Sequence, residues 1–137
     1  MKKFHLYFMG LLLSFAVNAT DFSQLEAAKT LLQEGVDTQQ ERVLLSSLKA
    51  FQRLLRRAPP HLKWLVNHYI GLNYYRLGTY YHYVAKNEEW AEEYYQMGLE
   101  TLNRSANQRP FAETDALISA IYGNIIPLSW FWSKIFC

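Results

Sequence analysis

Apolar residues return every three or four positions in five successive segments of this chain of 137 residues, and no segment alternates as a β-strand would. This spacing places the apolar side chains of each segment on one face of an α-helix. The sequence therefore predicts an all-α protein, and its length suits one domain. The expected helices cover residues 22–35, 42–58, 62–85, 87–106 and 112–124.

Local signals predict the ends of these helices. Gly35 is expected to end the first helix. Pro59 and Pro60 are expected to end the second, because proline lacks an amide proton and restricts the residue before it. Asn87 is the expected N-cap of the fourth helix, since acidic residues follow it in the first turn, where the helix dipole favours them.

The chain begins like a secretory signal peptide. Lys2 and Lys3 precede an apolar run over residues 4–17, and a small-residue exit follows at Ala19. The run is too short to span a bilayer comfortably. We therefore expect residues 1–19 to be cleaved, leaving a periplasmic bacterial protein with no stable membrane span. An uncleaved amphipathic start or a short anchor is the alternative.

Net charge and cysteine content limit the classes of function that the sequence supports. Loss of Lys2 and Lys3 leaves 12 basic and 12 acidic residues, so the mature chain has no net charge and gives no argument for nucleic-acid binding. The single cysteine, Cys137, cannot form an intramolecular disulfide. An incidental terminal thiol is the simplest reading, and pairing between chains is the other.

A pair of helices recurs along the chain. Three positions in the second helix match positions 44 residues later in the fourth, and a third repeat starts at Ile118–Ser119, followed by Tyr122. The matched positions are Ser47 with Ala91, Phe51 with Tyr95, and Leu54 with Gly98.

The order of residues within the second pair resembles the tetratricopeptide repeat (TPR) family. A large–small pair, Ile70–Gly71, precedes Tyr74 and Gly78, and the second helix carries Ala91 and Tyr95. The resemblance covers residues 22–123 and implies antiparallel helix pairs stacked as a short α-solenoid over residues 20–123.

The chain also departs from the family pattern. Asn67 stands where the family has a tryptophan, and the interval from Gly78 to Ala91 is longer by about two helical turns. One extra turn on each helix would preserve every packing face, so we expect elongated repeats. An ordinary helical bundle with chance periodicity is the alternative.

The segment HYIGLNYYRLGTYYHYV (residues 68–84) combines six tyrosines with two glycines. We expect small residues where helices cross closely and large rings beside them. Tyr74 and Tyr95 are the expected fillers. The expected close-approach residues are Ala28, Gly71 and Ser119 on first helices and Ser47 and Ala91 on second helices.

The TPR resemblance also implies a groove lined by the first helix of each pair, where peptides or proteins bind. Tyr75 offers apolar area with a polar tip, and Arg76 can fork onto a carboxylate. The alternative for Tyr75 is packing beneath neighbouring helices. The groove candidates are Leu25, Lys29, Leu32, His68, Leu72, Tyr75 and Arg76.

Two clusters of opposite charge stand out. The basic cluster comprises Lys49, Arg53, Arg56, Arg57 and Lys63, and the acidic cluster comprises Glu88, Glu89, Glu92, Glu93 and Glu100. Charge complementarity between neighbouring repeats is one explanation. Recruitment of an anionic partner or a membrane surface is the other.

Residues 124–137 (NIIPLSWFWSKIFC) form an aromatic tail in which Pro127 is expected to break any helix. We favour a tail that folds back as a cap on the repeats. Self-association through Trp130, Phe131 and Trp132 is a second possibility, and a chain shortened relative to its relatives is a third.

No arrangement of residues points to catalysis. His68 and His82 are fourteen residues apart on one helix, or about 21 Å along its axis, and cannot share a metal ion. The sequence thus predicts no enzyme, no cofactor and no metal. It favours a protein- or peptide-binding scaffold of the cell envelope. The alternative is an accessory subunit of a solute-uptake system that binds a small molecule in the aromatic groove.

Overall fold

The computed structural model describes the backbone of residues 21–136, and their side chains except at positions 129–132, 135 and 136. Within this range the secondary structure is helical and contains no strand, which confirms the all-α prediction. None of the helices in residues 21–136 has both the length and the apolar character needed to cross a membrane. The predicted signal peptide and Cys137 lie outside the described residues.

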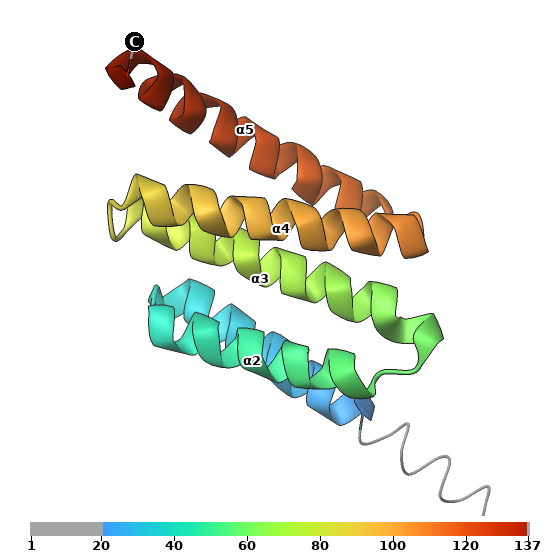
Figure 1. Ribbon diagram of the computed structural model, residues 1–137. Coiled ribbons are helices and arrows are strands. Elements are labelled where there is room, and N and C mark those ends of the chain that lie inside the picture. The colour runs from blue at the N-terminus through green and yellow to red at the C-terminus, as the bar shows by residue number, and fades with distance from the viewer. Residues whose placement is uncertain (1–20, 137) are drawn as a thin grey trace, which may run out of the picture.

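The helices follow one another in antiparallel order (Figure 1). The first helix and α2 form one hairpin, α3 and α4 form a second hairpin beside it, and α5 covers the other side of α4. A short 3₁₀ turn, Pro60–Leu62, joins the two hairpins. The helices span residues 21–38 (first helix), Glu41–Arg57 (α2), Lys63–Tyr83 (α3), Glu88–Gln108 (α4) and Ala112–Phe136 (α5).

The first helix does not end at Gly35 as predicted. It continues to residue 38 and closes with Gln39 in the left-handed region, at a φ of 52°. The Gln40 N–H donates to the Gly35 carbonyl (3.2 Å), and the Gln39 N–H donates to the Val36 carbonyl (3.4 Å). These two bonds form a Schellman motif. Gly35 is instead buried where Leu44 of α2 crosses, and a Cβ there would lie 2.8 Å from a Leu44 methyl carbon.

Two other predicted boundaries are confirmed. α2 ends at Arg57, just before the two prolines. Asn87 caps α4, because its side-chain oxygen accepts a hydrogen bond from the Trp90 N–H (3.1 Å).

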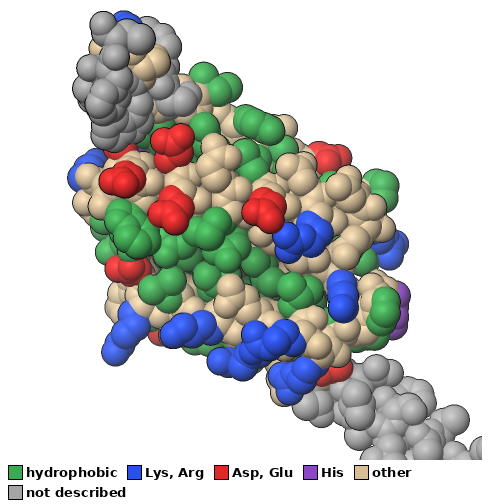
Figure 2. Space-filling model, in the orientation of Figure 1, with side chains coloured by type: hydrophobic (Ala, Val, Ile, Leu, Met, Phe, Trp, Pro, Cys, Tyr) green, Lys and Arg blue, Asp and Glu red, His purple; other side chains and the backbone are tan. Residues whose placement is uncertain are grey.

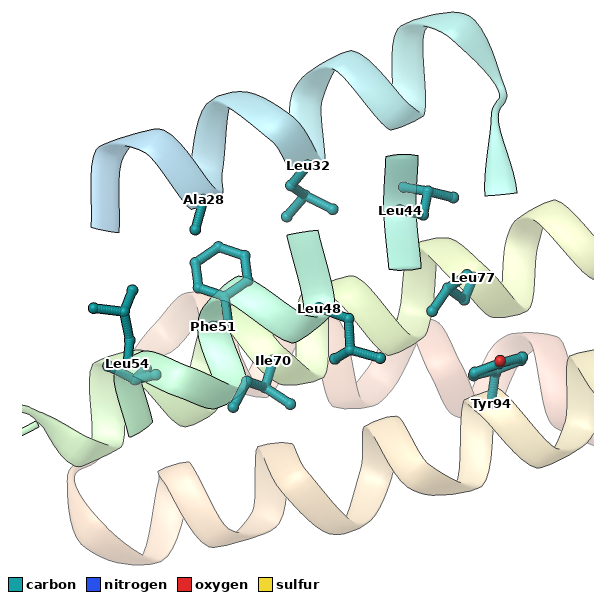
Figure 3. Packing of buried hydrophobic residues seen from close by; sticks show 10 residues of the cluster. Ala28, Leu32, Leu44, Leu48, Phe51, Leu54, Ile70, Leu77 and Tyr94 are labelled. Atoms are coloured by element: carbon teal, nitrogen blue, oxygen red, sulfur yellow. The ribbon is translucent and has the colours of Figure 1, made fainter. Parts of the chain in front are cut away.

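The main core lies between the two hairpins (Figure 3). Phe51 is fully buried at its centre, and its ring stacks on that of Tyr69 with centroids 5.5 Å apart. The buried residues of this core are Ala28, Leu32, Leu44, Leu48, Phe51, Leu54, Val66, Ile70, Leu77 and Tyr94. A second core joins α4 to α5 and comprises Ala91, Tyr95, Leu99, Leu102, Ile121, Ile125 and Leu128.

Close helix crossings account for the small residues. The Ser47 hydroxyl donates to the Ala28 carbonyl (2.9 Å), which joins α2 to the first helix. In the second hairpin Gly78 faces the ring of Tyr95, and a Cβ at Gly71 would lie 2.5 Å from Leu102. Such gaps let α3 and α4 approach closely while large side chains fill the space beside them.

Ser119 does not have the predicted close-approach role. Its side chain is exposed and donates to the Asp115 carbonyl of its own helix (3.0 Å). Thr114 is the buried small polar residue of α5, at 0% exposure. The two positions differ by five residues and therefore face different sides of the helix.

The prediction that Pro127 breaks the helix is wrong. α5 continues through Pro127 to Phe136. Ile125 and Leu128 on either side of Pro127 are buried in the second core, and this packing stabilises the helix across the proline. The side chains of Trp130, Phe131 and Trp132 lie outside the described residues.

Candidate functional site

A pocket of about 210 Å³ opens between the ends of the first helix and α3. Val36, Leu44 and Val84 supply apolar lining, whereas Arg76 and Thr79 supply polar groups. Tyr80 and Tyr83 also line it, together with Gly35 and Gln39. The pocket therefore combines an apolar wall with one arginine and two tyrosine residues.

Arg76 is held in position within this pocket. Its guanidinium carbon lies 5.4 Å from the centroid of the Tyr75 ring, a contact that favours a cation over an aromatic face. The Tyr75 ring packs in turn near Tyr95, with centroids 6.2 Å apart. No carboxylate among the described residues forms an ion pair with Arg76.

Two groove candidates do not have the exposure expected of them. His68 is 6% exposed and Leu32 is also 6% exposed. The His68 ring lies edge-on to Tyr69 and Phe111, and its Nδ1 is 2.9 Å from the Thr114 hydroxyl of α5. Burial lowers the pKa of His68 and outweighs the opposing effect of Glu113. His68 thus belongs to the α3–α5 interface.

The other candidates are partly buried and spread along the molecule. Leu25 lines an apolar pocket of about 330 Å³ at the opposite end from Arg76. Lys29 pairs with Glu26 (2.9 Å), a bond that raises its pKa, and its ammonium lies 5.4 Å from the Tyr69 ring centroid. Leu72 packs against the main core. The seven candidates therefore do not converge on one site.

The opposite face, over α2 and α4, carries an aromatic cluster that the sequence analysis missed. The ring of Tyr81 stacks on Trp90 (5.8 Å between centroids) and on Tyr94 (5.4 Å). The Tyr81 hydroxyl donates to the Glu41 carboxylate at the start of α2. Burial, then Glu41, raises the pKa of Tyr81, which keeps this hydroxyl a hydrogen-bond donor. Trp90 remains 46% exposed.

Sequence spacing offered one signal for this cluster. Trp90 and Tyr94 are four residues apart and so share a face of α4. The partners Tyr81 and Glu41 are 40 residues apart, and no local pattern links them.

Groups suited to metal binding are also scattered. Residues 21–136, where their side chains are described, contain no group of three or more His, Cys, Asp or Glu residues placed to hold a metal ion. Comparison of the chain with protein-family models, curated proteins and solved structures finds no match. The site is therefore interpreted from its own geometry.

Proposed function

We propose that this chain is a non-catalytic binding module that takes an acidic segment of a partner protein or peptide into the pocket beside Arg76. The observation that carries the proposal is the placement of Arg76. Arg76 lines a pocket with apolar walls, its guanidinium rests on Tyr75, and it has no described carboxylate partner. A guanidinium in this setting binds a carboxylate through charge-assisted hydrogen bonds.

The size of the pocket favours a side chain or a chain terminus as its occupant. A volume of about 210 Å³ lies below the ~300–1,000 Å³ of sites that enclose a whole small molecule. The walls offered by Val36, Leu44 and Val84 suit an apolar residue next to the acidic group. At the Arg76 pocket, peptide recognition is thus better supported than the solute-binding alternative.

A TPR-like arrangement of the hairpins is part of this proposal. Its support is the recurrence of small residues at equivalent helix crossings: Ser47 and Ala91 are both 0% exposed and lie 44 residues apart. The first helix and α3 both line the Arg76 pocket, as the first helices of TPR-like pairs would. The location in the cell envelope rests on the predicted signal peptide, and N-terminal sequencing of the secreted chain tests it.

Selection from a displayed library of random peptides tests the function. The wild-type chain should enrich peptides that carry Asp, Glu or a free carboxylate next to an apolar residue. Arg76→Glu should lose these peptides, because two carboxylates would then face each other. Lys63→Glu makes the same charge change at the other end of α3 and should select the wild-type set. Equal selection by wild type and Arg76→Glu would refute the proposed site.

A further inference from the structure

The face formed by α2 and α4 is divided into three parallel bands, which we call the striped face (Figure 2). Exposed basic residues run along α2, exposed acidic residues run along α4, and an apolar band separates them. The basic stripe is Arg42, Lys49, Arg53 and Arg56, the acidic stripe is Glu89, Glu93 and Glu100, and the apolar band includes Leu45, Tyr81, Trp90, Tyr94 and Met97.

Each stripe lies on one side of its helix. The basic residues are spaced by seven, four and three positions, and the acidic residues by four and seven. Three or four residues make about one helical turn and seven make about two, so the side chains of a stripe project in nearly the same direction.

The stripes do not neutralise each other within the chain. The sequence suggested charge pairing between repeats, but no ion pair joins α2 to α4 in the described structure. Arg104–Glu100 joins residues of a single helix. The apolar band keeps the two stripes apart. Glu100 pairs with Arg104 of its own helix, whereas the other residues of the stripes have no ion-pair partner among the described residues.

We propose that the striped face binds a second copy of this chain, in a symmetric dimer whose two-fold axis runs along the apolar band, parallel to the helices. Rotation by 180° about that axis places the α2 stripe of each copy against the α4 stripe of the other. The dimer then contains two equivalent contacts, each between a basic stripe and an acidic stripe. An axis across the helices would instead oppose like charges, which is unfavourable.

The register of the stripes fits this symmetry. Lys49 and Glu93 are 44 residues apart, and so are Arg56 and Glu100, which is the offset of the repeat. Equivalent positions in stacked repeats stand at similar heights along their helices. Lys49 of one copy therefore faces the partner's Glu93, and Arg56 faces the partner's Glu100.

The apolar band carries an aromatic cluster near the end of the face where α4 begins. Trp90 is 46% exposed and rests on Tyr81 and Tyr94, so its ring is already ordered before binding. The helices are about 25 Å (α2) and about 31 Å (α4) long, which suits a face of the about 600–1,000 Å² per partner that specific interfaces bury. The Arg76 pocket lies between the first helix and α3, so the dimer leaves it open.

A charge-exchange experiment tests the dimer. The protein is expressed from its full coding sequence, and its mass is measured by light scattering at up to about 100 μM, a range that detects micromolar association. The wild type should be dimeric, with a dissociation constant that rises with salt. The variants Lys49→Glu/Arg56→Glu and Glu93→Lys/Glu100→Lys should each dissociate at least about tenfold more readily, because each places like charges opposite one another at both paired positions.

An equimolar mixture of the two variants should restore the dimer, since at each paired position an acidic residue of one variant then faces a basic residue of the other. The double variant Glu34→Lys/Asp37→Lys on the first helix makes the same change in net charge as Glu93→Lys/Glu100→Lys and should remain dimeric. Circular dichroism checks that each variant is helical. A monomeric wild type, variants that stay dimeric at all salt concentrations, or a mixture that stays monomeric would each overturn the proposal. None of these outcomes bears on peptide binding at Arg76.

Discussion

Replacing Gly78 by alanine should destabilise the protein, although alanine is the better helix former. A Cβ at position 78 would lie 2.5 Å from two ring carbons of Tyr95, and Tyr95 is 0% exposed. The ring has no open side to move into, and overpacking of this kind costs about 1–3 kcal/mol. The higher helix propensity of alanine stabilises the folded state by about 1 kcal/mol, which offsets part of this cost. We expect a net loss of up to about 2 kcal/mol.

Gly123 provides a matched control in α5. It is exposed, and a Cβ there would meet no atom within 4 Å. Gly123→Ala therefore gains the helix propensity, up to about 1 kcal/mol, without a clash. Urea unfolding followed by far-ultraviolet circular dichroism gives the midpoint and slope for both variants. If Gly78→Ala proved as stable as Gly123→Ala, close packing would not explain why glycine stands beside so many tyrosines.

Three further perturbations test other parts of the structure. Acidification should destabilise the fold as the pH falls from the ordinary histidine pKa of 6.5 toward the lowered pKa of His68. In that range the unfolded chain binds more protons than the folded chain, and protonation therefore favours unfolding. The melting temperature of His68→Gln should depend less on pH over the same range. Asn87→Ala should cost about 1 kcal/mol in unfolding free energy, since the N-cap acceptor of α4 is lost; an unchanged urea midpoint would contradict the cap. Gln39→Gly should add about 0.5–1 kcal/mol, because glycine adopts a φ of 52° without the strain of a side chain; a lower melting temperature would contradict this.

Local signals predicted most helix boundaries, because their causes lie within a few residues. Pro59 ends α2 and Asn87 begins α4 through backbone effects that the sequence displays directly. The end of the first helix was predicted wrongly, because in the sequence a glycine required for contact with Leu44 looks the same as one that ends a helix. The effect of Pro127 was predicted wrongly, because the burial of Ile125 and Leu128 in the second core cannot be read from the local sequence.

The candidate site was harder to predict, because it depends on which helices meet. His68 has the spacing of a groove residue, yet α5 packs over it and Thr114 becomes its partner. Arg76 was identified for its chemistry, but the pocket around it requires Val36 and Leu44 from distant segments. The charge clusters were visible in the sequence, whereas their separation by an apolar band on one face required the fold.

Nuclear magnetic resonance would locate the binding site most directly. The strongest peptide from the library is titrated into the isotope-labelled protein, and the shifts of the backbone amides are followed. We predict that the largest changes occur at Gly35, Arg76, Thr79 and Val84, which line the pocket, and that Arg76→Glu abolishes them. Changes confined to other surfaces, or unaffected by Arg76→Glu, would contradict the assignment of the pocket as the binding site.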